Sequence, residues 1–276
     1  MLKLMYITND PEIAIIAENA GVDRIFIDME YIGKSNRQHG MDTVQSHHTV
    51  EDVKRVKQVI KKAQLMVRVN QIHDASDEYW ASEEEISAVI DAGADLVMLP
   101  YFHNAEEIKK FVKIVDRRAK VFPLLESKEA LENIDEILEV PGIDEIHIGL
   151  NDLALDLNKK FMFELLADGT VEMLCEKFRR KGIPYGFGGI GRLGKGDLPA
   201  EYVIKEHYRL GSGCAILSRS FCNANVITDK EIIREIFNDG IKEIRALEKE
   251  CESYQRYFVD NKCIVREKVK SIVGMR

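Results

Sequence analysis

Acidic and amide side chains follow several short apolar runs of the sequence, at the point where each run ends. Glu126 follows KVFPLL, and Asn151 and Asp152 follow EIHIGL. If these runs are parallel strands, their carboxyl ends meet at one edge, where two carboxylates can share a divalent cation. Mg²⁺ is typically held by one or two carboxylates, with its other positions left to water and substrate oxygens. Glu126 and Asp152 therefore indicate a metal site, with a helix cap or an ion pair as the alternative for each.

Arg68 is a further candidate for chemistry, because it lies between Val67 and Val69 in a run that should be buried on both faces. An unpaired arginine in such a place is strongly destabilising. Its planar guanidinium could neutralise a substrate carboxylate or a developing enolate oxygen. Asp28 and Glu30 flank one apolar residue and face the same side, so they could serve the site or tie down the loop that follows.

Three histidines lie in the long segment 30–48, namely His39, His47 and His48. Histidine titrates near neutral pH, which suits proton transfer. His47 and His48 directly precede an expected helix cap at Thr49 and should therefore lie on the same side as the strand ends. We predict that they are catalytic, and the alternative is that they are solvated surface residues.

The elements that must position these residues follow a recurring pattern, in which a helix-like segment ends in Gly and a short apolar run follows. Glycine accepts the left-handed backbone that ends many helices, and the apolar run then indicates a strand buried on both faces. The predicted strands are 3–8, 24–29, 64–69, 95–100, 120–125, 144–149, 184–188 and 213–218. The predicted helices are 11–20, 50–62, 83–92, 105–117, 128–139, 170–181, 199–209 and about 229–256.

Three of these helices begin at sequences that match or resemble capping boxes, Ser82…Glu85, Asn104…Glu107 and Thr228…Glu231, and Thr49…Asp52 is a weaker version. In such a box the first side chain accepts a hydrogen bond from the backbone of the first helical turn. We therefore expect Ser82 and Thr228 to cap their helices.

Eight strands alternating with helices predict a parallel sheet and, by their number, a single (β/α)₈ TIM barrel. A doubly wound open sheet is the alternative, but no GxGxxG motif follows the first strand. The long segments 30–48 and 70–82 both leave carboxyl ends of strands, where barrel enzymes build their sites. We predict one domain over 1–276, with a long helix and a tail over 228–276.

Composition excludes several classes of protein. Among 276 residues, 39 are Lys or Arg and 47 are Asp or Glu, so the net charge of −8 argues against nucleic-acid binding. No run of about 18 apolar residues is present, so no membrane span is expected. The start of the chain lacks the apolar core of a signal peptide. The five cysteines form no CxxC pair, and we therefore expect a reduced, cytoplasmic protein.

The glycine-rich segment GFGGIGRLGKG (186–196) matches neither a P-loop nor a dinucleotide-binding motif. A flexible loop at the barrel mouth is the plain interpretation. Barrels often bind phosphate after their last two strands, so Arg192 and Arg219 could instead receive the anionic end of an extended substrate.

Together these segments resemble the HpcH/HpaI aldolase/citrate lyase family of pyruvate/phosphoenolpyruvate-type barrels. The resemblance covers roughly residues 8–160 and, more weakly, GSGCAILSRSF near the last strand. The similar segments are AENAGVDRIFIDME, VRVN, GADLVMLPYFHNAEEIKKFV and PLLESKEALENIDEILEVPGIDEIHIGLNDLALDL.

The resemblance implies that Glu126 and Asp152 bind Mg²⁺ or another divalent cation such as Mn²⁺. It implies that Arg68 contacts the 2-oxo acid and stabilises its enolate. Glu30 matches an acidic residue of the family's polar network, and we expect Glu30 and Asn151 to contact substrate.

Three features depart from the family pattern, and one of them is that the second Asp, which follows the Glu of the second strand in citrate lyases, is missing. Class II pyruvate aldolases carry a His directly after the acidic residue of the second strand, where this chain has Tyr31. They also carry a Gln two residues before the metal-binding Glu, where this chain has Leu124, as citrate lyase-like members do. The general base is therefore not fixed by the resemblance, and His47 or His48 would have to replace it.

We predict a metal-dependent carbon–carbon lyase, similar to class II aldolases, that acts on a 2-oxo acid through a pyruvate enolate. The alternatives are a citrate lyase-like acyl-CoA lyase and a non-catalytic barrel that binds a metabolite. We also expect a homo-oligomer, because C-terminal helices in this family pack against neighbouring subunits. Packing of those helices on their own barrel is the other possibility.

Overall fold

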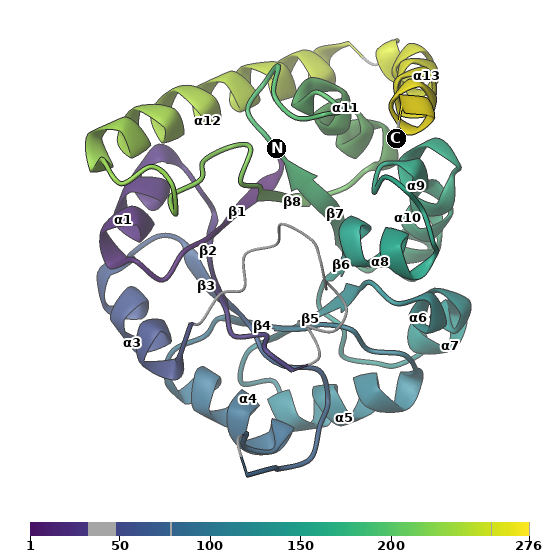
Figure 1. Ribbon diagram of the computed structural model, residues 1–276. Helices are drawn as coiled ribbons and strands as arrows, with labels where there is room; N and C mark the ends of the chain where they lie inside the picture. Colours follow the sequence, from purple (N-terminus) through teal and green to yellow (C-terminus); the bar gives the residue numbers. More distant parts are fainter. Residues whose placement is uncertain (33–47, 78, 255, 276) are drawn as a thin grey trace.

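The computed structural model describes residues 1–32, 48–77, 79–254 and 256–275. Its eight strands run parallel and close into a barrel, in which β8 returns to pair with β1 (Figure 1). This closure confirms the predicted (β/α)₈ barrel and excludes the open sheet. The strands are β1 (Lys3–Ile7), β2 (Arg24–Asp28), β3 (Gln64–Arg68), β4 (Leu96–Leu99), β5 (Lys120–Leu125), β6 (Ile146–Ile148), β7 (Tyr185–Ile190) and β8 (Cys214–Leu217).

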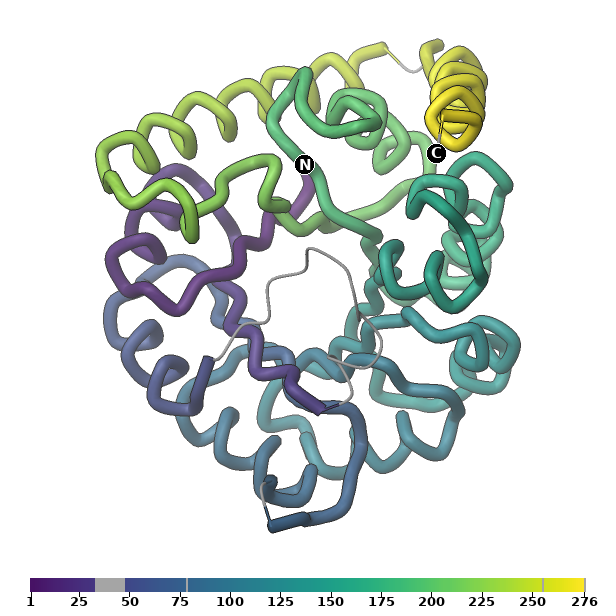
Figure 2. Tube along the Cα trace, viewed as in Figure 1, coloured from purple at the N-terminus to yellow at the C-terminus, as the bar shows by residue number. Residues whose placement is uncertain are grey.

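Helices surround the barrel, and the chain circles its axis once before the last helices cover the outside (Figure 2). None of the helices described here combines the length and the apolar character that crossing a bilayer would require. The helices are α1 (Pro11–Ala20), α3 (Val50–Val59), α4 (Ser82–Asp91), α5 (Ala105–Val115), α6 (Lys128–Glu132), α7 (Ile134–Ile137), α8 (Leu150–Asp156), α9 (Glu164–Ala167), α10 (Thr170–Lys181), α11 (Ala200–Leu210), α12 (Lys230–Ser253) and α13 (Tyr257–Met275).

Side chains alternate along each strand between the barrel interior and the ring of helices. Phe26 and Met66 belong to a buried apolar cluster drawn from several strands, which fills the interior. Asp28 and Arg68 lie two residues further along the same strands and are register partners. Both side chains therefore face the interior at the carboxyl end of the barrel.

An ion pair fills the opposite, amino-terminal end of the interior. Nη2 of Arg24, a residue with no exposed surface, lies 2.6 Å from Oε1 of Glu145. The guanidinium also lies 5.5 Å from the ring centre of Phe122, in a cation–π contact. Because this end is filled, the open space of the barrel is at the carboxyl end.

The chain ends in two helices where the sequence predicts one helix and a tail. α12 packs against α1 and α11, and α13 packs against α9 and α11. Asn261 on α13 is buried and donates a hydrogen bond of 2.8 Å to Oε1 of Glu206 on α11. Both helices thus pack on their own barrel, and a role for 228–276 at a subunit interface stays a prediction.

The cap of α12 allows a matched test of helix stability. Asp229 caps this helix, not Thr228 as predicted, and its Oδ1 accepts from the backbone N–H of Glu231 at 2.9 Å. Asp229→Ala should therefore lower the free energy of unfolding by about 1 kcal/mol in urea denaturation. Thr228→Ala should change it by less than about 0.5 kcal/mol. A larger loss from Thr228→Ala would contradict this assignment.

Candidate active site

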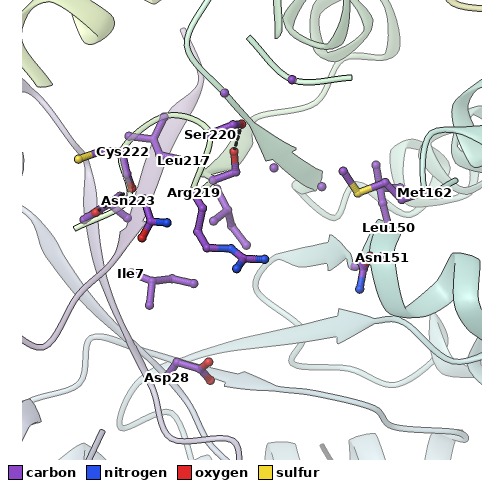
Figure 3. Close-up of a pocket in the computed structure, with 18 of the residues that line it drawn as sticks. Ile7, Asp28, Leu150, Asn151, Met162, Leu217, Arg219, Ser220, Cys222 and Asn223 are labelled. Carbon is purple, nitrogen blue, oxygen red and sulfur yellow. Dashed lines mark hydrogen bonds between the residues drawn. The ribbon is translucent and has the colours of Figure 1, made fainter. Parts of the chain in front are cut away.

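A cavity of about 650 Å³ lies at the carboxyl ends of the strands. Figure 3 shows part of its wall, with Asp28 and Asn151 on neighbouring sides. Residues from strand ends far apart in the sequence come together here because the barrel is closed. Of the site residues predicted from the sequence, those lining the cavity are Arg68, His48, Asn151, Glu126 and Asp152.

Arg68 is held by two carboxylates from the end of β2. Its Nε lies 2.8 Å from Oδ1 of Asp28 and its Nη2 lies 2.9 Å from Oδ2, so the pair is bidentate. Its Nη1 lies 3.3 Å from Oε2 of Glu30, which is buried. Asp28 and Glu30 therefore orient the arginine, and a contact between Glu30 and substrate stays a prediction.

The charge and direction of Arg68 follow from these partners. Burial disfavours a charged guanidinium, but the negative charges of Asp28 and Glu30 outweigh it and raise the pKa of Arg68 well above its usual value. Two of its five N–H bonds point at Asp28, and Glu30 lies within ion-pair distance of Nη1. The guanidinium is thus a fixed cation at the wall of the cavity, directed before any ligand arrives.

His48 joins this group through the backbone of β2. Its Nδ1 accepts a hydrogen bond of 3.0 Å from the backbone N–H of Asp28. A neutral imidazole carries one proton, so Nε2 must carry it and acts as a donor. The neighbouring Thr49 caps α3 in a full capping box with Asp52, which fixes the backbone beside His48. His39 and His47 lie outside the described residues.

Tyr31 occupies the place of the family histidine but cannot act as a base near neutral pH. Burial, with the charge of Asp28 nearby, raises the pKa of Tyr31 to about 12. Its backbone N–H donates to Oδ1 of Asn70 at 2.8 Å, and Asn70 in turn donates to Glu85 at 2.8 Å. Glu85 therefore anchors the segment after β2. The predicted capping box of Ser82 and Glu85 is wrong, because α4 has no side-chain cap and Ser82 is its first residue.

Glu126 directly follows β5 and is almost fully buried. Its Oε1 accepts a hydrogen bond of 3.1 Å from the backbone N–H of Tyr101. The register of β5 and β6 pairs Leu125 with Ile148, which places Gly149 opposite Glu126. A Cβ at Gly149 would lie 2.7 Å from Oε2 of Glu126. Glycine at this position therefore leaves the Glu126 carboxylate where it is, whereas a side chain would displace it.

Asp152 lies in the first turn of α8, which begins directly after β6. Its Oδ1 accepts a hydrogen bond of 3.0 Å from Nδ2 of Asn151. Both carboxylates line the same cavity, and carboxylate oxygens are the ligands that Mg²⁺ and Mn²⁺ prefer. Over the described ranges, no group of three or more His, Cys, Asp or Glu side chains is placed to hold a metal. A cation at Glu126 and Asp152 would therefore need water and substrate oxygens as its other ligands.

The contact between Gly149 and Glu126 provides a test of this site. Gly149 has φ −80°, so alanine fits the backbone and only the side-chain contact is at stake. Gly149→Ala should displace the carboxylate and weaken Mg²⁺ or Mn²⁺ binding about 10–100-fold, the usual effect of disturbing a residue that orients a ligand. Calorimetric titration measures this, with Gly274→Ala as the control, because a Cβ at Gly274 meets nothing within 4 Å. Unchanged affinity in Gly149→Ala would contradict the placement of the metal.

The sequence did not single out His147, which also lines the cavity. Burial lowers the pKa of His147 to about 4, so the ring is neutral. Its Nε2 lies 3.1 Å from the carbonyl oxygen of Gly188, to which it donates. His147 lies on β6, and Gly149 directly follows that strand. Residues two positions apart on a strand face the same side. This spacing was the available signal that His147 faces the interior of the barrel.

The fold and the site define a TIM barrel with a fixed arginine and two carboxylates around a cavity at the carboxyl ends of its strands. A family model, HpcH/HpaI aldolase/citrate lyase, matches residues 3–164, more than half of the chain. The chain belongs to this family, as the resemblance in its sequence predicts.

One relative is similar in sequence, and two solved structures are similar in fold. The Hydroxypyruvate/pyruvate aldolase of Rhizorhabdus wittichii is 39% identical over an alignment of 77 residues, and the match covers 25% of this chain and 31% of that protein. The chain thus matches about a third of that relative's length. An HpcH/HpaI aldolase from Desulfitobacterium hafniense has a TM-score of 0.58 at 18% identity, over 79% of this chain and 86% of that one. A family protein from Burkholderia cenocepacia has a TM-score of 0.62 at 15% identity, over 85% and 94%.

Proposed function

We propose that this protein is a divalent-metal-dependent carbon–carbon lyase that cleaves or forms a 2-oxo acid through a pyruvate-like enolate. The observation that carries the proposal is the fixed Arg68–Asp28 pair, which lies on the same cavity as Glu126 and Asp152. Membership of an aldolase and lyase family supports this class of reaction.

Glu126 and Asp152 would hold the cation, and Asn151 would orient Asp152 through the bond between their side chains. When bound, the cation neutralises negative charge on the 2-oxo acid and polarises its keto group. The buried position of Glu126 favours a cation, because a carboxylate that has lost its water gains more from a positive neighbour.

Arg68 would bind the 2-oxo acid and stabilise the charge that develops on its keto oxygen. When a 4-hydroxy-2-oxo acid is cleaved, the C4 hydroxyl gives its proton to solvent and C4 becomes the aldehyde carbonyl. The electron pair of the C3–C4 bond forms the C2=C3 double bond, and the keto oxygen becomes the enolate oxygen. Protonation of C3 from solvent then gives pyruvate. A donor already directed at that oxygen lowers the barrier without reorganisation. Asp28 and Glu30 supply this direction, and their charge keeps the guanidinium protonated at any working pH.

His48 would act as a neutral hydrogen-bond donor through Nε2–H. The bond from the Asp28 backbone to Nδ1 fixes this tautomer. An imidazole in this state donates to a negatively charged oxygen but does not accept a proton at Nε2. We therefore assign His48 to stabilising charge and not to general-base catalysis.

Two substitutions at His48 separate these roles. His48→Phe should lower kcat about 10²-fold, the lower range for loss of a charge-stabilising donor. His48→Gln, whose amide N–H can reach a similar position, should keep kcat within about tenfold of the native value. Steady-state kinetics of aldol cleavage measures both variants. If Gln impairs turnover as strongly as Phe does, a base role is indicated.

Two other functions stay open, each favoured by one residue. Leu124, on the cavity wall in place of the aldolase Gln, favours a citrate lyase-like acyl-CoA lyase. Tyr31, protonated in place of the family His, favours a barrel that binds a metabolite without catalysis.

Oxaloacetate decarboxylation tests the proposal directly. The purified protein with Mg²⁺ or Mn²⁺ should release CO₂ and pyruvate from oxaloacetate above the metal-only rate, and EDTA should stop it. A requirement for a CoA thioester would instead identify the acyl-CoA lyase. Absence of turnover with either substrate, together with intact binding of pyruvate, would leave the binding barrel. Size-exclusion chromatography tests the expected homo-oligomer in the same preparation.

A further inference from the structure

The segment that follows β3 is joined to itself through the ring of His73. Its Nδ1 lies 2.7 Å from the carbonyl oxygen of Gln71, and its Nε2 lies 2.7 Å from the carbonyl oxygen of Trp80. The backbone N–H of His73 donates to Oγ of Ser82 at 2.8 Å, and the backbone N–H of Ser82 donates to the carbonyl oxygen of His73 at 3.2 Å. These four residues bring the two ends of the segment together, and we call them the His73 clasp.

The two carbonyl contacts define the charge of the His73 ring. A carbonyl oxygen only accepts hydrogen bonds, and a neutral imidazole carries a single N–H. In either neutral form, one ring nitrogen would therefore direct its lone pair at a carbonyl oxygen 2.7 Å away. The hydroxyl of Ser82, 3.0 Å from Nδ1, could donate to that nitrogen, but the carbonyl oxygen of Gln71 would still face a lone pair. An imidazolium donates from both nitrogens, so this geometry is that of the protonated ring.

The carboxylates around His73 favour a positive ring. Burial raises the pKa of Glu85 on α4, and the charge of His73 opposes this rise. The pKa of Glu83 on the same helix is lowered by its own backbone N–H, by Lys110 and by His73. Attraction between charges is mutual, so both carboxylates stabilise an imidazolium. Nζ of Lys110 on α5 lies 3.1 Å from Oε1 of Glu83 and offsets part of its charge.

The clasp directly follows a residue that holds the segment after β2. Asn70 donates to Glu85 at 2.8 Å, and its Oδ1 accepts from the backbone N–H groups of Tyr31 at 2.8 Å and Ile32 at 2.9 Å. β3 ends in Arg68, two positions before Asn70. A change in the clasp therefore acts on backbone that is tied to the candidate active site.

We propose that His73 is a proton-dependent clasp, which holds the segment 71–82 when its ring is protonated and loses one of its two carbonyl contacts when the ring is neutral. Histidine changes charge between about pH 5 and 8. Because the closed segment binds the additional proton, raising the pH through this range removes a donor and lowers the local stability. The device does not depend on which reaction the barrel catalyses.

Amide hydrogen exchange of the whole protein tests the proposal. The backbone N–H of Ser76 donates to the carbonyl oxygen of Tyr79 at 2.9 Å, and that of Ser82 donates to His73, so both amides report whether the segment is closed. Their protection, corrected for the intrinsic effect of pH on exchange, should fall about tenfold as the pH rises from about 5 to 8. This is the effect of losing one hydrogen bond to a charged group. NMR of the ring nitrogens should show two N–H groups on His73 at the acidic end of the range.

Two variants assign the step in protection to one ring. His73→Gln carries no titratable group, so its protection should be low and should not change with pH over this range. His103→Gln is the matched control, because hydrogen bonding to Glu107 raises the pKa of His103, which lies outside the clasp. It should keep the step. Trp80 is the single tryptophan and is 59% exposed, so acrylamide quenching of its fluorescence should increase with the same midpoint.

Equal protection at both ends of the pH range in the native protein would overturn the proposal. A step that persists in His73→Gln would also overturn it, because another group would then titrate. The NMR measurement needs no variant, and a His73 ring with a single N–H at about pH 5 would reject the clasp as well.

Discussion

Glu126→Gln and Asp152→Asn should each abolish turnover and weaken Mg²⁺ or Mn²⁺ binding below detection. Each substitution keeps the shape of the side chain and removes one negative charge, which is the main attraction for a hard cation. The hydrogen bond from the Tyr101 backbone to Glu126 can persist, because the amide oxygen of glutamine still accepts it. Calorimetry measures the metal affinity, and oxaloacetate decarboxylation measures the turnover.

The matched control is Glu84→Gln, an equal loss of charge at an exposed position in the first turn of α4. It should leave metal binding and turnover unchanged. Melting temperatures should show that the two site variants remain folded. Native metal affinity in both Glu126→Gln and Asp152→Asn would reject the metal site proposed here.

Arg68→Ala should lower kcat about 10²–10³-fold, the effect of removing a donor that stabilises developing charge. Equal losses in kcat and kcat/KM would indicate a role in the transition state, whereas a raised KM alone would indicate simple binding. Steady-state cleavage of a 4-hydroxy-2-oxo acid measures both quantities. Near-native turnover of every accepted 2-oxo acid would show that the enolate mechanism is wrong.

The pairing of Arg68 adds a consequence for stability. Without the arginine, the buried carboxylates of Asp28 and Glu30 lose their counter-charge, and breaking a buried pair costs about 3–5 kcal/mol. Arg68→Lys keeps the charge but loses the bidentate fork, so it should fold and still turn over slowly. If the lysine variant is both folded and fully active, the geometry of the guanidinium is not required.

Local sequence signals determined most of the barrel. The predicted strand 120–125 and helices 11–20 and 170–181 agree with β5, α1 and α10. Each signal is short in range: a glycine with positive φ after a helix, as at Gly21 and Gly182, then a run of apolar residues. Parallel strands need a long crossover connection between them, usually a helix. The alternation of strand and helix patterns therefore specifies the barrel without knowledge of its side-chain contacts.

The same signals were weaker at helix ends, where several neighbouring residues can each end or cap a helix. The predicted helix 128–139 is two helices, α6 and α7, that meet at Asn133. α13 was missed, because few of its side chains are buried and its apolar pattern is weak. Ser82 and Thr228 carry a capping sequence, but Ser82 contacts His73 instead and Asp229 caps α12.

At the site, the sequence supplied the candidates, because residues that end parallel strands must converge once the barrel closes. It could not pair them. Asp28 rather than Glu126 holds Arg68, since strand register places Asp28 beside it. The tautomer of His48 depends on a backbone N–H twenty positions earlier in the chain. Pairing and protonation depend on distances of about 3 Å between groups remote in sequence, and only the closed tertiary structure sets those distances.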